Sequence, residues 1–210
     1  MKLLIGIYLF FARLVIYCYL GFGGYKLWSK IYRFLWERKW RDVELKTFTT
    51  IAEMAKFVGG PGHWRADSWR ALWDSVSSPQ RVQQIFAGIE PQPEHDLDCD
   101  DYMSFEAAVL HKSLKEGVLK EPDLAAVHCL TITWLEAGTV FGSGHNVTLL
   151  EYKDGLWGYI DYFLPSSRVM SREAVVTMVR NRYVGVGKWV GVAWMVSTPD
   201  TFTPTETHRG

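Results

Sequence analysis

The chain has 210 residues, a mass of 24.1 kDa and a formal net charge of zero. This length excludes two full-sized domains, and a hydrophobic content of 48% with 22% charged residues excludes a disordered chain. The balanced charge gives no electrostatic reason to expect a nucleic-acid partner.

The first 41 residues combine an apolar stretch with a basic one. They hold eight Lys or Arg and one acid, whereas residues 42–210 hold fifteen bases and twenty-two acids. Between residues 3 and 22 the only charge is Arg13, and twenty helical residues reach about 30 Å, the thickness of a bilayer core. Arg13 opposes insertion by about 2.5–3.5 kcal/mol. A membrane span, a helical hairpin packed on protein and a cleaved signal peptide are the three interpretations.

A basic amphipathic helix is predicted after the glycines at 21, 23 and 24. Lys26, Lys30, Arg33 and Glu37 recur at helical spacing, and four aromatic residues lie among the bases: Trp28, Tyr32, Trp36 and Trp40. Such residues are typical of a headgroup boundary. If residues 3–22 span a membrane, the positive charge that follows leaves the main domain in the cytoplasm. We therefore expect membrane association through residues 1–41, with a virion or soluble cytoplasmic location as the alternative.

Helices dominate the next part of the chain. Thr50 and Glu53 have capping-box spacing and predict a short helix that ends at residues 59–62. A helical patch follows at Trp69, Leu72, Trp73 and Val76, and Ser78-Pro79 begins another helix that runs through Phe86. After a loop at residues 88–98, Asp98 is the expected N-cap of a helix that ends before Gly117.

Alternating and β-branched patterns predict four strands beyond Pro122, at residues 127–134, 145–152, 156–163 and 189–195. A hairpin turn is expected at 153–155 and a helix at 171–180. The predicted fold class is α+β, with helices packed on an antiparallel sheet of about four strands. The domain boundaries follow: a helical anchor at 1–41, the main domain at 42–197 and a disordered tail at 198–210.

Three side chains have the chemistry of thiol acyl transfer. Cys99 lies in the first turn of a predicted helix, His145 opens a strand, and Asp161 lies on the next strand. A free thiol has a pKa of about 8.5, and a helix N-terminus or a nearby imidazolium lowers it. His145 would act as general base and acid, and Asp161 would orient its ring.

The number of residues in the hairpin loop, odd or even, tests this assignment. A three-residue loop at 153–155 places Val147 opposite Asp161, so that His145 lies diagonal to Asp161 on the same face. A two-residue loop would put the two side chains on opposite faces. The constellation therefore predicts a three-residue turn that ends in a left-handed Gly155.

Several motifs resemble one family in their order and spacing. Asp98-Cys99-Asp100-Asp101-Tyr102 begins a helix, Gly144-His145-Asn146-Val147 begins a strand, Tyr159-Ile160-Asp161 follows, and a short helix precedes them all at residues 78–82. Over residues 47–165 the chain is similar to the transglutaminase-like (papain-like fold) superfamily, and within it to the bacterial and phage transglutaminase-like cysteine peptidases. The resemblance implies Cys99 as nucleophile, His145 as base and acid, and Asp161 as orienter. It also implies a peptide or protein substrate and no cofactor.

Two function hypotheses remain open at this point. The first is a thiol-dependent amide hydrolase or acyl transferase that works through a thioester. The second is a catalytically silent structural or binding protein of a membrane or virion assembly, which the acidic neighbours of Cys99 favour because they oppose thiolate formation. The acidic residues at 94–101 have the carboxylate side chains that bind Ca²⁺, but they lack the order of ligands found in an EF-hand. A solvated loop with helix capping is the preferred interpretation. Cys129 is predicted to be core, and no metal site is expected. The sequence does not indicate the oligomeric state.

Overall fold

The computed structural model describes residues 34–35, 37–59, 77–91, 97–136, 142–183, 185–186, 189–199 and 204–209. The apolar stretch at 3–22, the amphipathic segment up to residue 33, the patch at 69–76 and the tail residues 200–203 lie outside this description. Within the described ranges, no helix has the length and apolar character needed to cross a bilayer.

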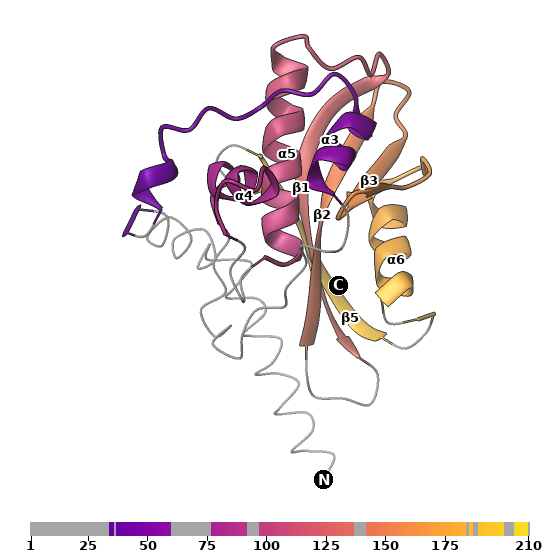
Figure 1. The fold of residues 1–210 in the computed structure, drawn as a ribbon. Helices are drawn as coiled ribbons and strands as arrows, with labels where there is room; N and C mark the ends of the chain where they lie inside the picture. The colour runs from indigo at the N-terminus through magenta and orange to yellow at the C-terminus, as the bar shows by residue number, and fades with distance from the viewer. Residues whose placement is uncertain are drawn as a thin grey trace.

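A six-stranded antiparallel sheet forms the centre of the molecule, with strand order β4-β3-β2-β1-β5-β6 (Figure 1). Its strands are β1 (Leu124–Glu136), β2 (Gly142–Tyr152), β3 (Trp157–Asp161), β4 (Leu164–Pro165), β5 (Trp189–Ser197) and β6 (Pro204–Arg209). The α+β class is confirmed, whereas the prediction of about four strands is too low. The two additional strands, β4 and β6, are the two edges of the sheet.

The expected disordered tail is wrong for residues 204–209, because β6 pairs there with β5. Its sequence is rich in Thr, Pro and charged residues and contains no apolar alternation. An edge strand with a proline as its first residue needs no apolar face of its own, since backbone hydrogen bonds to β5 hold it. The pattern that identifies half-buried strands therefore could not reveal it.

Local capping signals define the helices in the described residues. These are a short 3₁₀ helix η1 (Arg38–Trp40) and the α-helices α3 (Ile51–Val58), α4 (Pro79–Phe86), α5 (Cys99–Lys115) and α6 (Arg172–Tyr183). The predicted N-caps are confirmed: Thr50, Ser78 and Asp98 each accept a hydrogen bond from a backbone N–H in the first turn. Satisfying these otherwise orphaned donors is what sets the helix starts.

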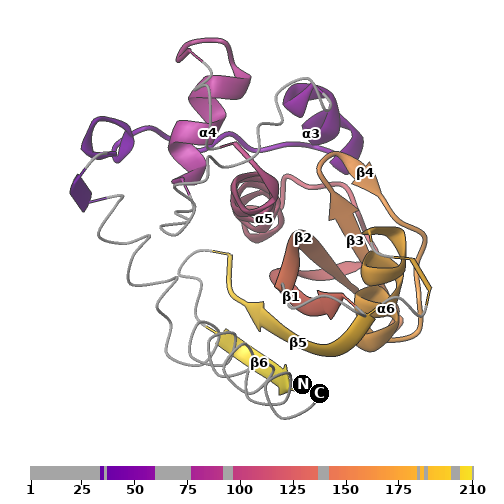
Figure 2. The same cartoon turned by 90° about the horizontal axis from the view of Figure 1, so that it is seen from below.

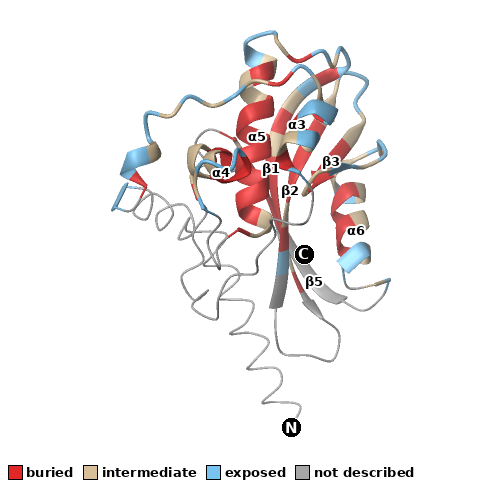
Figure 3. Cartoon of the chain, in the orientation of Figure 1, coloured by how far each residue is buried: buried red, intermediate tan, exposed pale blue. Residues whose placement is uncertain are grey.

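The sheet separates two helical layers (Figure 2). Helices α3, α4 and α5 pack on one face over Val127, Cys129 and Leu150, and Cys129 is fully buried as predicted. Helix α6 packs on the other face over Ile132 and Val147, among others. The buried positions in Figure 3 follow the central strands and α5. Both faces of β1 and β2 are therefore covered, and successive residues of these strands enter different cores.

The β2–β3 hairpin has the predicted three-residue turn. Leu149 is opposite Tyr159 and Glu151 is opposite Trp157, which leaves residues 153–155 as the loop. Gly155 has a φ of 80°, in the left-handed region, and its N–H donates to the carbonyl of Tyr152. Thr148 is opposite Ile160, so the next residues in this register, Val147 and Asp161, are also opposite each other.

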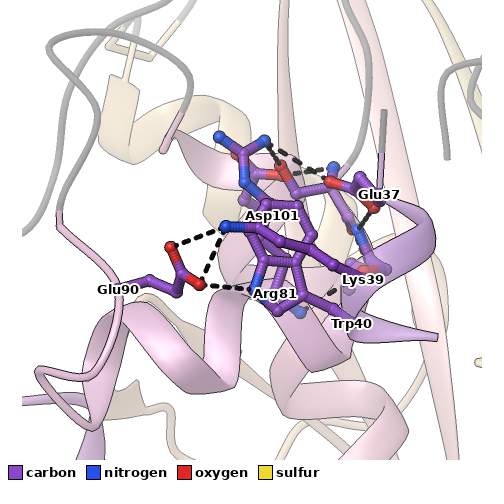
Figure 4. A network of polar contacts seen from close by, with 9 residues as sticks. Glu37, Lys39, Trp40, Arg81, Glu90 and Asp101 are labelled. Carbon is purple, nitrogen blue, oxygen red and sulfur yellow. Dashed lines mark hydrogen bonds and ion pairs between the residues drawn. The ribbon is translucent and has the colours of Figure 1, made fainter. Parts of the chain in front are cut away.

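The segment around η1 is attached to the main domain by polar contacts (Figure 4). The buried Glu37 accepts from the backbone N–H of Ser78 at 2.7 Å and pairs with Arg81 at 3.4 Å. Lys39 and Trp40 both donate to the carboxylate of Glu90. The expected division between residues 41 and 42 is therefore crossed by contacts, and residues 37–41 belong with the domain.

Candidate thiol site and histidine-aspartate pair

Cys99 is the first residue of α5, as the motif predicted. Asp98 caps the helix by accepting from the N–H of Asp100, and Cys99 as a whole residue is half-buried. Its hydrogen-bond partner among the described residues is the side-chain amide of Asn146, at 3.6 Å from Sγ. Burial, and then the charges of Asp98 and Asp100, raise the pKa of Cys99 well above its ordinary value, while hydrogen bonds from Asn146 act in the opposite direction.

His145 and Asp161 form a closely bonded pair. Nε2 of His145 lies 2.8 Å from Oδ1 of Asp161, and the two residues are 4% and 1% exposed. The hydroxyl of Tyr183 donates to both carboxylate oxygens, at 3.0 and 2.8 Å, and the Arg182 guanidinium lies 3.1 Å from Oδ2. The Tyr183 ring also lies against the imidazole, with centroids 4.1 Å apart. The end of α6 thus covers the pair.

The thiol and the imidazole occupy opposite faces of β2. Asn146 points to α5, where it meets Cys99, and Thr148 on the same face donates to Glu106 of α5. His145 precedes Asn146, is paired across the strands with Ile132 of the α6 core, and contacts Tyr183 of α6. Neighbouring strand residues alternate in direction. The described contacts of His145 include no bond to Cys99, so the structure brings together two of the three predicted residues.

Loop parity explains this outcome. An odd loop places His145 and Asp161 on a common face, which the structure shows, but it does not determine which face α5 covers. That choice depends on whether Leu149 or Leu150 faces α5, and both are apolar. Leu150 packs with α5 and Leu149 packs with α6.

Sequence reasoning missed several residues of this region. Arg182 and Tyr183 lie at the end of α6, two and three residues beyond the predicted helix, and nothing near them in the sequence signals a partner on β3. Glu106 faces the sheet on α5 at seven residues from Cys99, and that helical spacing is the signal that would have identified it. Burial raises the pKa of Glu106 well above its ordinary value, although its bond from Thr148 acts in the opposite direction.

The α5–β2 contact is polar for a buried surface. Three buried oxygens have no hydrogen-bond partner among the described residues: the Tyr102 hydroxyl, Oε1 of Glu106 and Oδ1 of Asn146. Tyr102 and Glu106 both lie on the α5 side of the sheet, and the phenol of Tyr102 has a raised pKa, chiefly because of burial. Each buried oxygen without a hydrogen-bond partner costs about 1–3 kcal/mol of stability. The hydrogen bonding of the core is therefore incomplete at the α5–β2 contact.

The acidic side chains at the start of α5 act as caps and anchors. The carboxylates of Asp98, Asp100 and Asp101 approach within 4.8 Å of one another. Asp98 caps the helix, and Asp101 accepts from the backbone N–H of Ser77 at 2.6 Å. The predicted helix capping is confirmed at Asp98, whereas the expectation of solvated side chains is wrong for Asp100 and Asp101, which are buried.

Comparisons of the chain with protein-family models, with curated proteins and with solved structures find no match.

Proposed function

We propose that this chain is a structural or binding protein that keeps a helix-on-sheet fold without thiol turnover. The observation that carries the proposal is the separation of Cys99 and His145 on opposite faces of β2. A thiol is activated by an adjacent base within about 2.6–3.2 Å, or somewhat farther in a resting enzyme. Here a strand lies between the two groups.

The electrostatics of the two sites support the same conclusion. Burial and two neighbouring carboxylates raise the pKa of Cys99, so the neutral thiol predominates at pH 7. The imidazole has its Nε2 on Asp161 and one face of its ring against Tyr183. In this arrangement His145 and Asp161 connect α6 with β2 and β3 through their contacts, which is a structural role.

Residues 1–36 are the part of the chain that we propose contacts a membrane or an assembly. Their excess of positive charge and interleaved aromatic residues suit a membrane surface or a virion assembly. Deleting residues 1–36, which leaves Glu37 in place, should move the protein from the membrane pellet to the soluble fraction. An unchanged distribution would contradict the assignment to a membrane.

A thiol-dependent amide hydrolase or acyl transferase of papain-like fold is the second candidate. It is favoured by the position of Cys99 at the first residue of a 17-residue helix and by the His145–Asp161 bond. In this reaction the thiolate adds to an amide carbonyl, the amine leaves with a proton from the imidazolium, and water or another amine cleaves the thioester. The imidazole would first have to reach the α5 face of β2.

Alkylation by iodoacetamide across a range of pH separates the two candidates. A silent protein should show Cys99 alkylation that is slow at pH 7 and rises only above the ordinary thiol pKa of about 8.5. The His145→Ala variant should leave that pH profile unchanged. An enzyme should show alkylation with an apparent pKa well below 8.5, abolished in Cys99→Ala and shifted upward in His145→Ala. The buried Cys129 should remain unlabelled in the folded protein, which provides an internal control.

A further inference from the structure

A cavity of about 550 Å³ lies on the outer side of α5. This volume is within the range of about 300–1,000 Å³ that small-molecule sites occupy. Its apolar lining comes from Leu45, Pro79, Ala108 and Pro199, and its polar lining from Gln80, His111, Lys112, Lys115 and Glu116. The lining therefore offers a ligand both an apolar surface and several polar side chains.

The cavity is separate from the thiol region. Along α5 each residue turns by about 100°, so the lining residues Ala108, His111, Lys112 and Lys115 point about 120–220° away from Cys99. Cys99 and Glu106 both contact β2. The cavity therefore opens on the side of α5 that faces away from the sheet.

One wall of the cavity is held in place by hydrogen bonds. Nζ of Lys112 donates to the carbonyl of Leu45 at 2.6 Å and to the Glu44 carboxylate at 3.0 Å. The side chain of Gln83 bonds to the backbone on both sides of Leu45, because it donates to the carbonyl of Glu44 and accepts from the N–H of Lys46. The Leu45 wall is thus formed before any ligand arrives, which reduces the ordering cost of binding.

The polar side chains that line the cavity differ in whether they have a hydrogen-bond or ion-pair partner. Lys112 faces two carboxylates, those of Glu44 at 3.0 Å and Glu116 at 3.8 Å, so it offers no unpaired charge to a ligand. Lys115, His111 and Gln80 have no side-chain hydrogen bond or ion pair with the residues that the structure describes. Three potential donors beside an apolar wall therefore remain available to an acceptor.

We propose that this cavity binds a small ligand that carries one carboxylate beside a compact apolar group. The ammonium of Lys115 supplies a charged donor for the carboxylate, and a ring N–H of His111 and the amide of Gln80 supply two further donors. Leu45, Pro79 and Pro199 take the apolar group. An uncharged apolar ligand would offer no acceptor to these donors.

The test uses N-acetyl-leucine, which has a carboxylate and an isobutyl group, with N-acetyl-leucinamide as the uncharged counterpart. Binding to the full chain is measured by calorimetry and by saturation-transfer NMR. The acid should bind, and the amide should bind at least about tenfold more weakly, because a hydrogen bond to a charged group contributes about 1.5–3 kcal/mol. Lys115→Gln should weaken binding of the acid to a similar extent. Lys56→Gln removes an exposed lysine of α3 outside the cavity and should leave the affinity unchanged.

A second variant tests the apolar part of the site. Ala108→Leu adds three carbons to the cavity wall and should reduce the affinity for both probes, with the unfolding temperature measured to show that the variant is folded. The proposal is overturned if the acid does not bind at millimolar concentration. It is also overturned if acid and amide bind equally well, or if Lys115→Gln and Lys56→Gln behave alike.

Discussion

Asp161 is almost completely buried, yet its carboxylate meets His145, Tyr183 and Arg182. These contacts come from β2 and from the last turn of α6, so a single side chain on β3 joins three elements. A buried carboxylate is tolerated only when hydrogen bonds and opposite charge replace its hydration. The same side chain gives α6 its polar attachment to the sheet.

Asp161→Asn should destabilise the protein by about 3 kcal/mol in urea unfolding, because removing one partner of a buried pair leaves the other groups uncompensated. Asp123→Asn is the matched control, since Asp123 is 64% exposed and pairs with Arg168 on the surface. The control should change the free energy of unfolding by less than about 1 kcal/mol. Equal losses in the two variants would show that the buried pair has no structural role.

Glu106 gives a pH-dependent prediction. Because burial raises the folded-state pKa of Glu106, the native protein retains this proton over a pH range in which the unfolded chain has lost it. Stability therefore falls as the pH rises from the unfolded pKa of about 4.3 toward the folded pKa. Glu106→Gln keeps an acceptor for Thr148 and should remove this decline.

The measurement is the free energy of unfolding between pH 4 and pH 8. Glu116→Gln, an exposed carboxylate near the end of α5, should leave the pH slope as in the parent chain. A slope unchanged by Glu106→Gln would contradict the raised pKa.

At the scale of elements, short-range chemistry determines where helices and turns begin. Thr50, Ser78 and Asp98 start three helices by bonding to their own first turns. Gly155 allows the β2–β3 turn because its φ of 80° is strained for other L-residues. No second segment of the chain is needed for these effects, which is why the helix starts could be predicted from the local sequence.

Gly155→Ala should cost about 1–2 kcal/mol of stability, since alanine is disfavoured in the left-handed region. Gly155→Asn should cost less, because asparagine adopts this conformation more readily. No atom lies within 4 Å of a Cβ added at this position, so the difference between the two variants reports backbone conformation and not a clash. Equal destabilisation would argue against a left-handed turn.

At the scale of the whole molecule, buried polar contacts attach the chain around η1 to the helical layer. Glu37 reaches Ser78 at the start of α4 and also Arg81, and Asp101 of α5 bonds to the neighbouring Ser77. The segment that follows the N-terminal apolar and basic region is therefore fixed to the helices beside Cys99.

Glu37→Ala should destabilise the protein by about 2–3 kcal/mol, because it leaves a backbone N–H and a largely buried guanidinium without this carboxylate. Asp42→Ala, which removes a carboxylate that is 89% exposed, should have an effect within about 0.5 kcal/mol. A double-mutant cycle of Glu37 and Arg81 in thermal or urea unfolding measures their coupling. A coupling energy of zero would show that the pair does not hold this segment.

The sequence by itself determined the helix starts, because capping bonds act over a few residues, and it predicted the three-residue hairpin loop only on the condition that His145 and Asp161 share a face. Only the tertiary structure decided that α5 covers the Asn146 and Thr148 face of β2 while α6 covers the other. Both faces of this strand carry apolar residues, so either face could have accepted α5. The pairing of β6 with β5 and the contact of Tyr183 with Asp161 were decided in the same way. These contacts depend on packing between segments that are far apart in the chain, and no local sequence pattern in either segment predicts its partner.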